Sequence, residues 1–260
     1  MRFLFNHHSS HHNYARQLQI PQVRDKVLKS LNETFDLVMS CKDVCFDTKI
    51  NSNLPIKCEE LRMSPNGSHL DPSLPIFFDP LGADGVPPPH PTHTETQEHL
   101  KQINQEWGQE PTIKLTLGDE AYDLIYTIED VFRVCRRDVS LPPGDPLISL
   151  MHHAKWVASD NISPEIIADG FDGAVFRGRR WMPYAAWKAR NALILPHTMI
   201  AVLNETREED KLLMKEVRTI LAVMITRLEG GSFPHHTAVP VSRAFKLYEF
   251  SLLLTSFFDK

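Results

Sequence analysis

One segment of the chain, residues 177–190, combines basic side chains with aromatic rings. It reads RGRRWMPYAAWKAR and contains no acidic residue. Basic side chains between rings can hold phosphate groups and stack on bases, as in sites for single-stranded nucleic acid. The same side chains can instead lay their stems over aromatic faces within a protein. The candidate residues for binding an anion or a nucleic acid are Arg177, Arg179, Arg180, Trp181 and Lys188.

Acidic residues flank this segment on both sides, so its charges have partners within the chain. Asp160, Glu165, Asp169 and Asp172 precede it, and Glu205, Glu208, Glu209 and Asp210 follow it. Ion pairs of this kind need no external ligand, and exposed pairs add little stability. We therefore predict that the segment joins parts of the domain, with anion or nucleic-acid binding as the alternative.

Signals for a metal site are weaker. Cys41, Cys45, Cys58 and His69 give the spacing C-x3-C-x12-C-x10-H, which has the ligand count of a zinc site but looser spacing. No HExxH sequence is present. We predict ordinary thiols and no metal site.

Catalytic motifs are not recognisable either. The sequence contains no G-x-S-x-G, no GxxxxGK[ST] and no GxGxxG. Asp169 and Asp172 lie beside glycines, where Asp-Gly serves a turn. A metal-dependent nuclease would also need a second carboxylate and a lysine presented at short spacing. We predict no catalytic residue and no cofactor.

Composition limits the class of protein. The chain has 260 residues, 42% of them hydrophobic, with 28 basic and 33 acidic residues and a formal charge of −5. This balance excludes a protein coated in positive charge, so any contact with nucleic acid is local. The sequence has no apolar run of about 18 residues, which predicts no membrane partner. The apolar start before HHSSHH is too short for a secretion signal, and the cysteines are few, so we predict a cytoplasmic or nuclear protein.

The N-terminal part is predicted to be helical and separate from the main domain. Apolar residues recur at helical spacing over 21–40, with Pro21 suited to the first turn. Residues 64–97 are rich in proline, and VPPPHP at 86–91 favours polyproline II. The predicted division is an N-terminal helical region at 1–63, a proline-rich linker at 64–97 and a main domain at 98–260.

The main domain is predicted to be α+β and predominantly helical, with a few short strands. Alternation in TIKLTL indicates a strand, whereas apolar stripes and capping residues such as Thr206 and Glu209 indicate helices. Pro183 suits the first turn of a helix that carries most of the basic aromatic segment. The predicted strands lie near 112–117, 174–177 and 238–248, and the predicted helices at 119–137, 147–158, 183–195 and 206–229.

Three stretches, 113–134, 169–195 and 204–231, resemble a group of uncharacterised proteins from filamentous fungi. The resemblance extends over about half of the chain. Fungal products of this kind include cluster-encoded pathogenicity factors such as the pea pathogenicity proteins. The resemblance implies a contribution to fungal fitness or virulence, and it implies no site residue.

Together these patterns predict a non-enzymatic intracellular binding or accessory protein whose partner is another protein. The alternative is a nucleic-acid-binding or nuclease-like protein that uses residues 177–190.

Overall fold

The described residues of the computed structural model form two compact units. Residues 86–157 belong to one unit, and residues 13–56 and 158–244 belong to the other. The predicted division at 64–97 is different and stays a prediction, since most of that segment lies outside the described residues. The structure describes 13–47, 51–56, 86–107, 116–142, 144–159, 162–176, 181–191, 195–204 and 212–244, with side chains from Pro21 onward in the first helix.

Helix α1, Asn13–Ser40, confirms the predicted N-terminal helix. It begins earlier than the sequence pattern predicts, so Pro21 lies inside the helix and not in its first turn. Phe35 and Val38 are buried, and Leu28 and Leu31 pack against the same core. This spacing places one apolar stripe along the helix.

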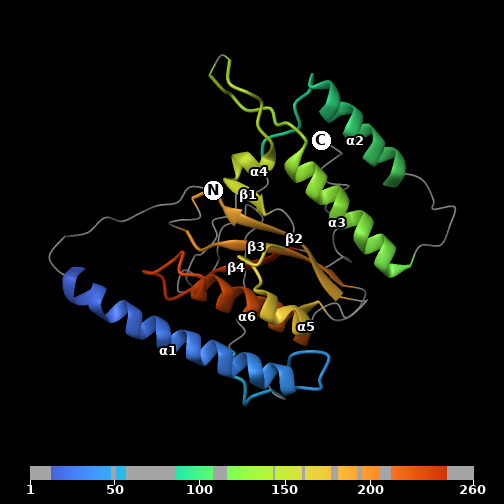
Figure 1. The fold of residues 1–260 in the computed structure, drawn as a ribbon. Helices are drawn as coiled ribbons and strands as arrows, with labels where there is room; N and C mark the ends of the chain where they lie inside the picture. Colours follow the sequence, from blue (N-terminus) through green and yellow to red (C-terminus); the bar gives the residue numbers. More distant parts are fainter. Residues whose placement is uncertain are drawn as a thin grey trace. The chain divides into compact units, whose positions relative to one another are not determined.

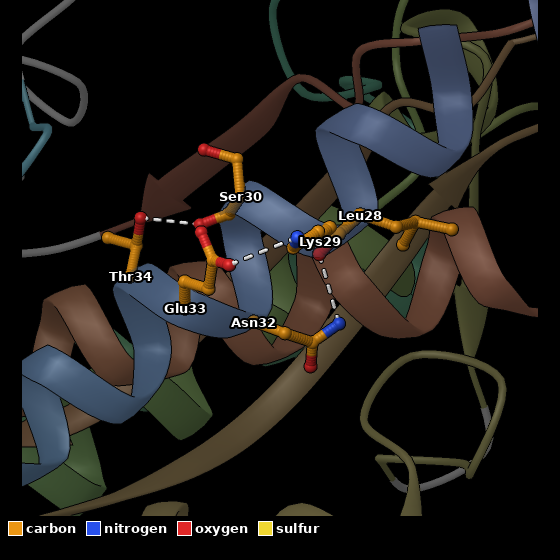
Figure 2. Close-up of polar contacts among 6 residues, drawn as sticks. All are labelled: Leu28, Lys29, Ser30, Asn32, Glu33 and Thr34. Carbon is orange, nitrogen blue, oxygen red and sulfur yellow. Dashed lines mark hydrogen bonds and ion pairs between the residues drawn. The ribbon is translucent and has the colours of Figure 1, made fainter. Parts of the chain in front are cut away.

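Polar side chains of α1 bond within the helix (Figure 2). Asn32 Nδ2 donates to the carbonyl oxygen four residues earlier at 3.0 Å, and Thr34 Oγ1 donates to that of Ser30 at 2.7 Å. Lys29 and Glu33 form an exposed ion pair at 3.8 Å. Because Thr34 is buried, its bond to the helix backbone satisfies a hydroxyl group that water does not reach.

Helix α6, Met214–Glu229, is buried on almost every side. Figure 1 shows it between the sheet and α1, which explains why it lacks a long polar face. Its end agrees with the predicted helix 206–229. The predicted capping residues Thr206 and Glu209 lie outside the described residues, and the chain caps α6 by a bond from Leu213 N to Glu216 Oε2 at 2.8 Å.

The ends of α1 and α6 are joined by two arginines. Arg24 Nη2 donates to the carbonyl oxygen of Leu228, near the end of α6. Arg218 Nη2 donates to the carbonyl oxygens of Val38 and Cys41, each at 3.3 Å, at the end of α1. The last carbonyls of a helix have no partner within it and carry partial negative charge. Each helix therefore supplies a cation to the end of the other, which fixes their antiparallel arrangement.

A small mixed sheet lies on the other side of α6 (Figure 1). Its strands follow the order β1-β2-β3-β4, and the division between the two units falls within β1. β2 and β3 pair antiparallel, with a register irregularity after Pro183, and β3 and β4 pair in parallel. The bounds are β1 Trp156–Ser159, β2 Trp181–Ala189, β3 Thr198–Asn204 and β4 Val241–Ala244.

β2 shows that the predicted helix 183–195 is wrong. Pro183 lies in a strand, at the register irregularity where a residue without an N–H is tolerated. Ala185, Ala186 and Trp187 are consecutive and all buried, so the strand lacks the polar alternation by which a half-buried strand is recognised. The pairing with β3 decides the conformation of this segment. Because β3 lies later in the sequence, a local pattern of residues does not reveal it.

Other predicted elements around the sheet also differ. The predicted strand 174–177 is wrong, because Ala174 and Val175 belong to α5, Asp172–Val175, and Phe176 is its C-cap. α5 follows the 3-10 helix η2, Asp169–Phe171. The predicted helix 147–158 is much shorter, since α4 spans only Leu150–His153 before β1 begins. β4 lies within the predicted strand 238–248, and residues 245–260 lie outside the described residues.

The core of the larger unit collects side chains from α1, α6 and the sheet. Ile200 and Val202 of β3 lie in the same apolar cluster as Val223 and Ile225 of α6. A helix layer against a small sheet is the arrangement of an α+β protein, which confirms the predicted fold class.

The smaller unit contains α2, Thr94–Trp107, and α3, Leu117–Arg133. α3 confirms the predicted helix at 119–137, whereas α2 was not predicted. Of the predicted strand 112–117, residues 112–115 lie outside the described residues and Leu117 already begins α3. Thr116 and Asp119 form a capping box, and the hydrogen bonds from Thr116 hold the pKa of Asp119 below its usual range.

The end of the proline-rich segment pairs with the chain after α3. His90 N donates to the carbonyl oxygen of Arg136, and Asp138 N donates to that of Pro88, each at 2.8 Å. Arg137 N donates to the carbonyl oxygen of Ile148 at 2.9 Å. The stretch predicted to favour polyproline II thus pairs, through backbone hydrogen bonds, with the segment that follows α3. Extended backbone suits both conformations.

Lys155 adopts a left-handed conformation, with φ of 61°, in the turn between α4 and β1. A side chain at such an angle is strained, whereas glycine is not. We expect Lys155→Gly to raise the free energy of unfolding by about 0.5–1 kcal/mol. Guanidinium unfolding of the full chain measures this effect. Lys101→Gly, inside α2, is the opposite control and should destabilise by about 1 kcal/mol.

Candidate functional site

Of the five residues predicted to bind an anion or nucleic acid, the structure describes the side-chain surroundings of Lys188 alone. Arg177, Arg179 and Arg180 lie outside the described residues. Trp181 begins β2, where its backbone pairs with Asn204, and its side chain is not described. Lys188 lies at the other end of the same strand. The contacts of Lys188 are therefore the structural evidence on the five candidate residues.

Lys188 is held by an ion pair within the larger unit. Its Nζ lies 3.0 Å from Glu165 Oε2, a residue of the turn that precedes η2. The hydrogen bond from Lys188, followed by its charge, lowers the pKa of the Glu165 carboxyl group. The pair joins β2 to this turn. The joining role predicted for residues 177–190 as a whole stays a prediction.

A second cation, Arg227, interacts with the same carboxylate through its charge. Arg227 belongs to the last turn of α6, and only 5% of its surface is exposed. Its guanidinium group stacks 4.5 Å from the centre of the Phe233 ring. Burial lowers the pKa of Arg227, and the charge of Glu165 opposes this shift. Among the described residues, its Nε and Nη2 atoms have no hydrogen-bond partner.

Arg227 has two physical reasons for its position. A cation in the last turn of a helix is favoured by the helix dipole. The Phe233 ring also supplies a cation–π contact to the guanidinium group of Arg227. Gly231, with φ of 68°, reverses the chain after α6, so that Phe233 returns to the last turn of this helix. His236 packs edge-on against the same ring at 5.8 Å. The sequence analysis missed this group. The available signal was an arginine within an apolar stripe, followed by Gly-Gly and an aromatic residue.

The cluster of Glu165, Lys188, Arg227 and Phe233 holds positive charge within the unit. Lys188 pairs directly with Glu165, and Arg227 interacts with this carboxylate through its charge. The three side chains together carry a formal charge of +1. An anion near Arg227 would be disfavoured by the end of α6, where the last carbonyls concentrate negative charge. The arrangement therefore suits a contact that ties β2, the turn and α6 together.

We expect Glu165→Gln to lower the free energy of unfolding by about 0.5–1 kcal/mol at neutral pH, since both side chains of the pair reach solvent. The folded-state pKa of Glu165 lies below its ordinary value of 4.5, so the pair stabilises the fold above that pH. This contribution is lost as the pH falls through the folded-state pKa. Unfolding curves from neutral to acid pH should converge for the two proteins. A constant difference across this range would contradict the assignment, and the exposed Glu98→Gln provides the control.

A different surface, the outward face of α3, presents aromatic rings to solvent. Tyr122 and Tyr126 are 49% and 55% exposed and lie four residues apart, on one face of the helix. The opposite side of α3 is buried through Ala121, Leu124 and Ile125. We call Asp119, Tyr122, Asp123, Tyr126 and Arg133 the α3 outer face. The sequence analysis missed it, although the two tyrosines are visible opposite the apolar stripe.

Acidic residues surround these tyrosines. α3 contains five carboxylates and one arginine, a formal charge of −4, while the whole chain carries −5. Arg133 pairs with Glu129 at 3.4 Å within the helix. Asp130 Oδ2 lies 2.8 Å from Nε2 of His99 on α2. These contacts engage the C-terminal carboxylates of α3, and Asp119 caps the start of the helix. The exposed carboxylate of Asp123 lies between the two tyrosines in the sequence.

Other features of the described residues do not add a site. They contain no group of three or more side chains able to hold a metal ion. Cys41, Cys45 and Cys135 form no disulfide, and burial raises the pKa of the Cys135 thiol to about 11; Cys58 and His69 lie outside the described residues. No helix in the described part of the chain is long and apolar enough to cross a membrane. Comparison of the chain with known protein families, curated proteins and solved structures gave no match.

Proposed function

We propose that the protein is a non-enzymatic binding or accessory protein and that it contacts another protein through the α3 outer face. The observation that supports this proposal is the exposure of Tyr122 and Tyr126 side by side on a helix whose other face is buried. Tyrosine is enriched at protein interfaces because its rigid ring buries a large area and its hydroxyl group tolerates water. The contribution to fungal fitness or virulence implied by the resemblance stays a prediction.

Site-specific photocrosslinking tests this proposal. A benzophenone amino acid replaces Tyr126 in the full chain, and the matched control carries it at Leu37, an exposed apolar residue of α1. After irradiation in cell extract, we expect one protein to be joined at position 126 and not at position 37. Excess unlabelled protein should compete for this adduct, whereas excess Tyr122→Ala/Tyr126→Ala protein should not. Equal labelling at both positions would remove the proposal.

The alternative proposal is nucleic-acid or nuclease-like activity through the basic aromatic segment. Its support is the composition of residues 177–190, and the pairing of Lys188 with Glu165 weakens it. Titration of single- and double-stranded nucleic acid across salt concentrations is the direct measurement, because phosphate contacts weaken steeply with salt. Binding lost on changing Arg179 and Arg180 to alanine would favour the alternative, and a cleavage assay with added metal ions tests the nuclease version.

A further inference from the structure

We infer that the α3 outer face binds an arginine-rich segment of a partner protein. The guanidinium groups would stack on Tyr122 and Tyr126 and pair with the neighbouring carboxylates. This inference rests on the proposed function, because it specifies the partner of the same surface.

The spacing of the rings fits two arginines of an extended segment. Tyr122 and Tyr126 are four residues apart in α3, which corresponds to about 6 Å along the axis. Alternate side chains of an extended chain point the same way and lie about 6.6 Å apart. Two arginines in the pattern R-x-R can therefore each cover one ring. Arginine suits this geometry because its planar group stacks on aromatic faces and still donates to a carboxylate.

Carboxylates of α3 lie close enough to the two rings to accept hydrogen bonds from stacked arginines. Asp119 precedes Tyr122 by three residues, and Asp123 precedes Tyr126 by three, so each ring has a carboxylate beside it on the helix surface. Asp119 Oδ2 already accepts the capping bonds from Thr116, which makes Asp123 the main acceptor for an arginine. Asp123 is exposed. α2, which approaches α3 through His99, adds three glutamates and one lysine, a formal charge of −2. This field attracts a basic segment and repels nucleic acid and anionic membranes.

Fluorescence anisotropy with the full chain tests the partner class. The probe is a labelled peptide of alternating glycine and arginine, and the control peptides carry citrulline or lysine in place of arginine. We expect the arginine peptide to bind, the lysine peptide to bind more weakly and the citrulline peptide not to bind. Affinity should fall as ionic strength rises from about 0.01 M to about 0.15 M, which shortens the screening length from about 30 Å to about 8 Å.

Matched variants assign the binding to the α3 outer face. Tyr126→Ala should weaken it by about tenfold, and Tyr126→Phe, which keeps the ring, by less than about threefold. Asp123→Asn should weaken it at low salt and have little effect at high salt. Leu37→Ala and Asp36→Asn on α1 replace an exposed apolar and an exposed acidic residue and should leave the affinity unchanged.

Three results would overturn the inference. The first is equal binding of the citrulline and arginine peptides, and the second is full affinity in both Tyr126→Ala and Asp123→Asn. The third is self-association at low salt that Tyr126→Ala abolishes, which would make a second copy of this chain the occupant. If position 126 crosslinks selectively to a protein while the arginine peptide does not bind, the inference fails and the proposed function stands. If neither occurs, both fail.

Discussion

Replacing Phe233 by alanine should lower the free energy of unfolding by about 3–5 kcal/mol, the usual cost of removing a buried phenylalanine ring. Phe233 is fully buried, and its ring contacts the guanidinium group of Arg227 at 4.5 Å and the ring of His236 at 5.8 Å. The substitution leaves a cavity under the last turn of α6. It also removes the cation–π contact of Arg227. Two nitrogen atoms of this arginine have no hydrogen-bond partner among the described residues. Guanidinium unfolding of the full chain measures the loss.

Two further variants separate the packing of Phe233 from its contact with Arg227. Phe233→Leu keeps most of the apolar volume and loses the ring, so we expect a loss of about 1–2 kcal/mol. In an Arg227→Met background, the same change should cost less, because no cation remains to be stabilised. Additive effects of the two substitutions would show that the ring acts by packing alone. A loss below about 1 kcal/mol for Phe233→Ala would contradict its assigned position in the core.

The sequence was a good guide where one helix face alone is buried, because α1 and α3 follow regular apolar stripes. It was also a good guide to the end of α6, which Gly230 and Gly231 mark. In each case, the information that decides the conformation lies within a few turns of the chain.

The prediction of a helix at 183–195 was wrong because the conformation of β2 depends on a distant partner strand. Ala185, Ala186 and Trp187 are buried on both faces of the strand, so no alternation appears, and Pro183 favoured a helix start. The pairing with β3 outweighs these local signals, and it depends on residues from Thr198 onward. A partner strand of this kind cannot be recognised from local periodicity.

The candidate sites divide in the same way. Charge composition marked residues 177–190 and therefore Lys188, but it could not show that Glu165, in a preceding turn, is the partner of Lys188. Arg227 was missed because its surroundings depend on the return of the chain at Gly231. The tyrosines of α3 were missed because an exposed ring has meaning only after the buried face of the helix is known. Residue types and spacing could mark these side chains, but the tertiary structure shows which groups surround each of them.

Replacing Thr226 by valine should lower the free energy of unfolding by about 1–3 kcal/mol, although the two side chains have nearly the same shape. Thr226 is buried in α6, and its Oγ1 accepts a hydrogen bond from Ala168 N at 3.0 Å. Ala168 precedes η2 and follows the buried Ile166 and Ile167. Valine offers no acceptor, so the N–H of Ala168 loses its partner while the surrounding side chains stay in place. Urea unfolding of the full chain measures the difference.

Thr219→Val is the matched control for this prediction. Thr219 is also buried in α6, but its Oγ1 donates to the carbonyl oxygen of Lys215, one turn earlier in the same helix. That carbonyl retains its bond within the helix after the change, so we expect an effect within about 0.5 kcal/mol. Equal losses for the two variants would mean that burial of the hydroxyl group, and not the bond to Ala168, sets the energy. A loss confined to Thr226→Val would identify this hydrogen bond as the link between α6 and the turn that carries Glu165.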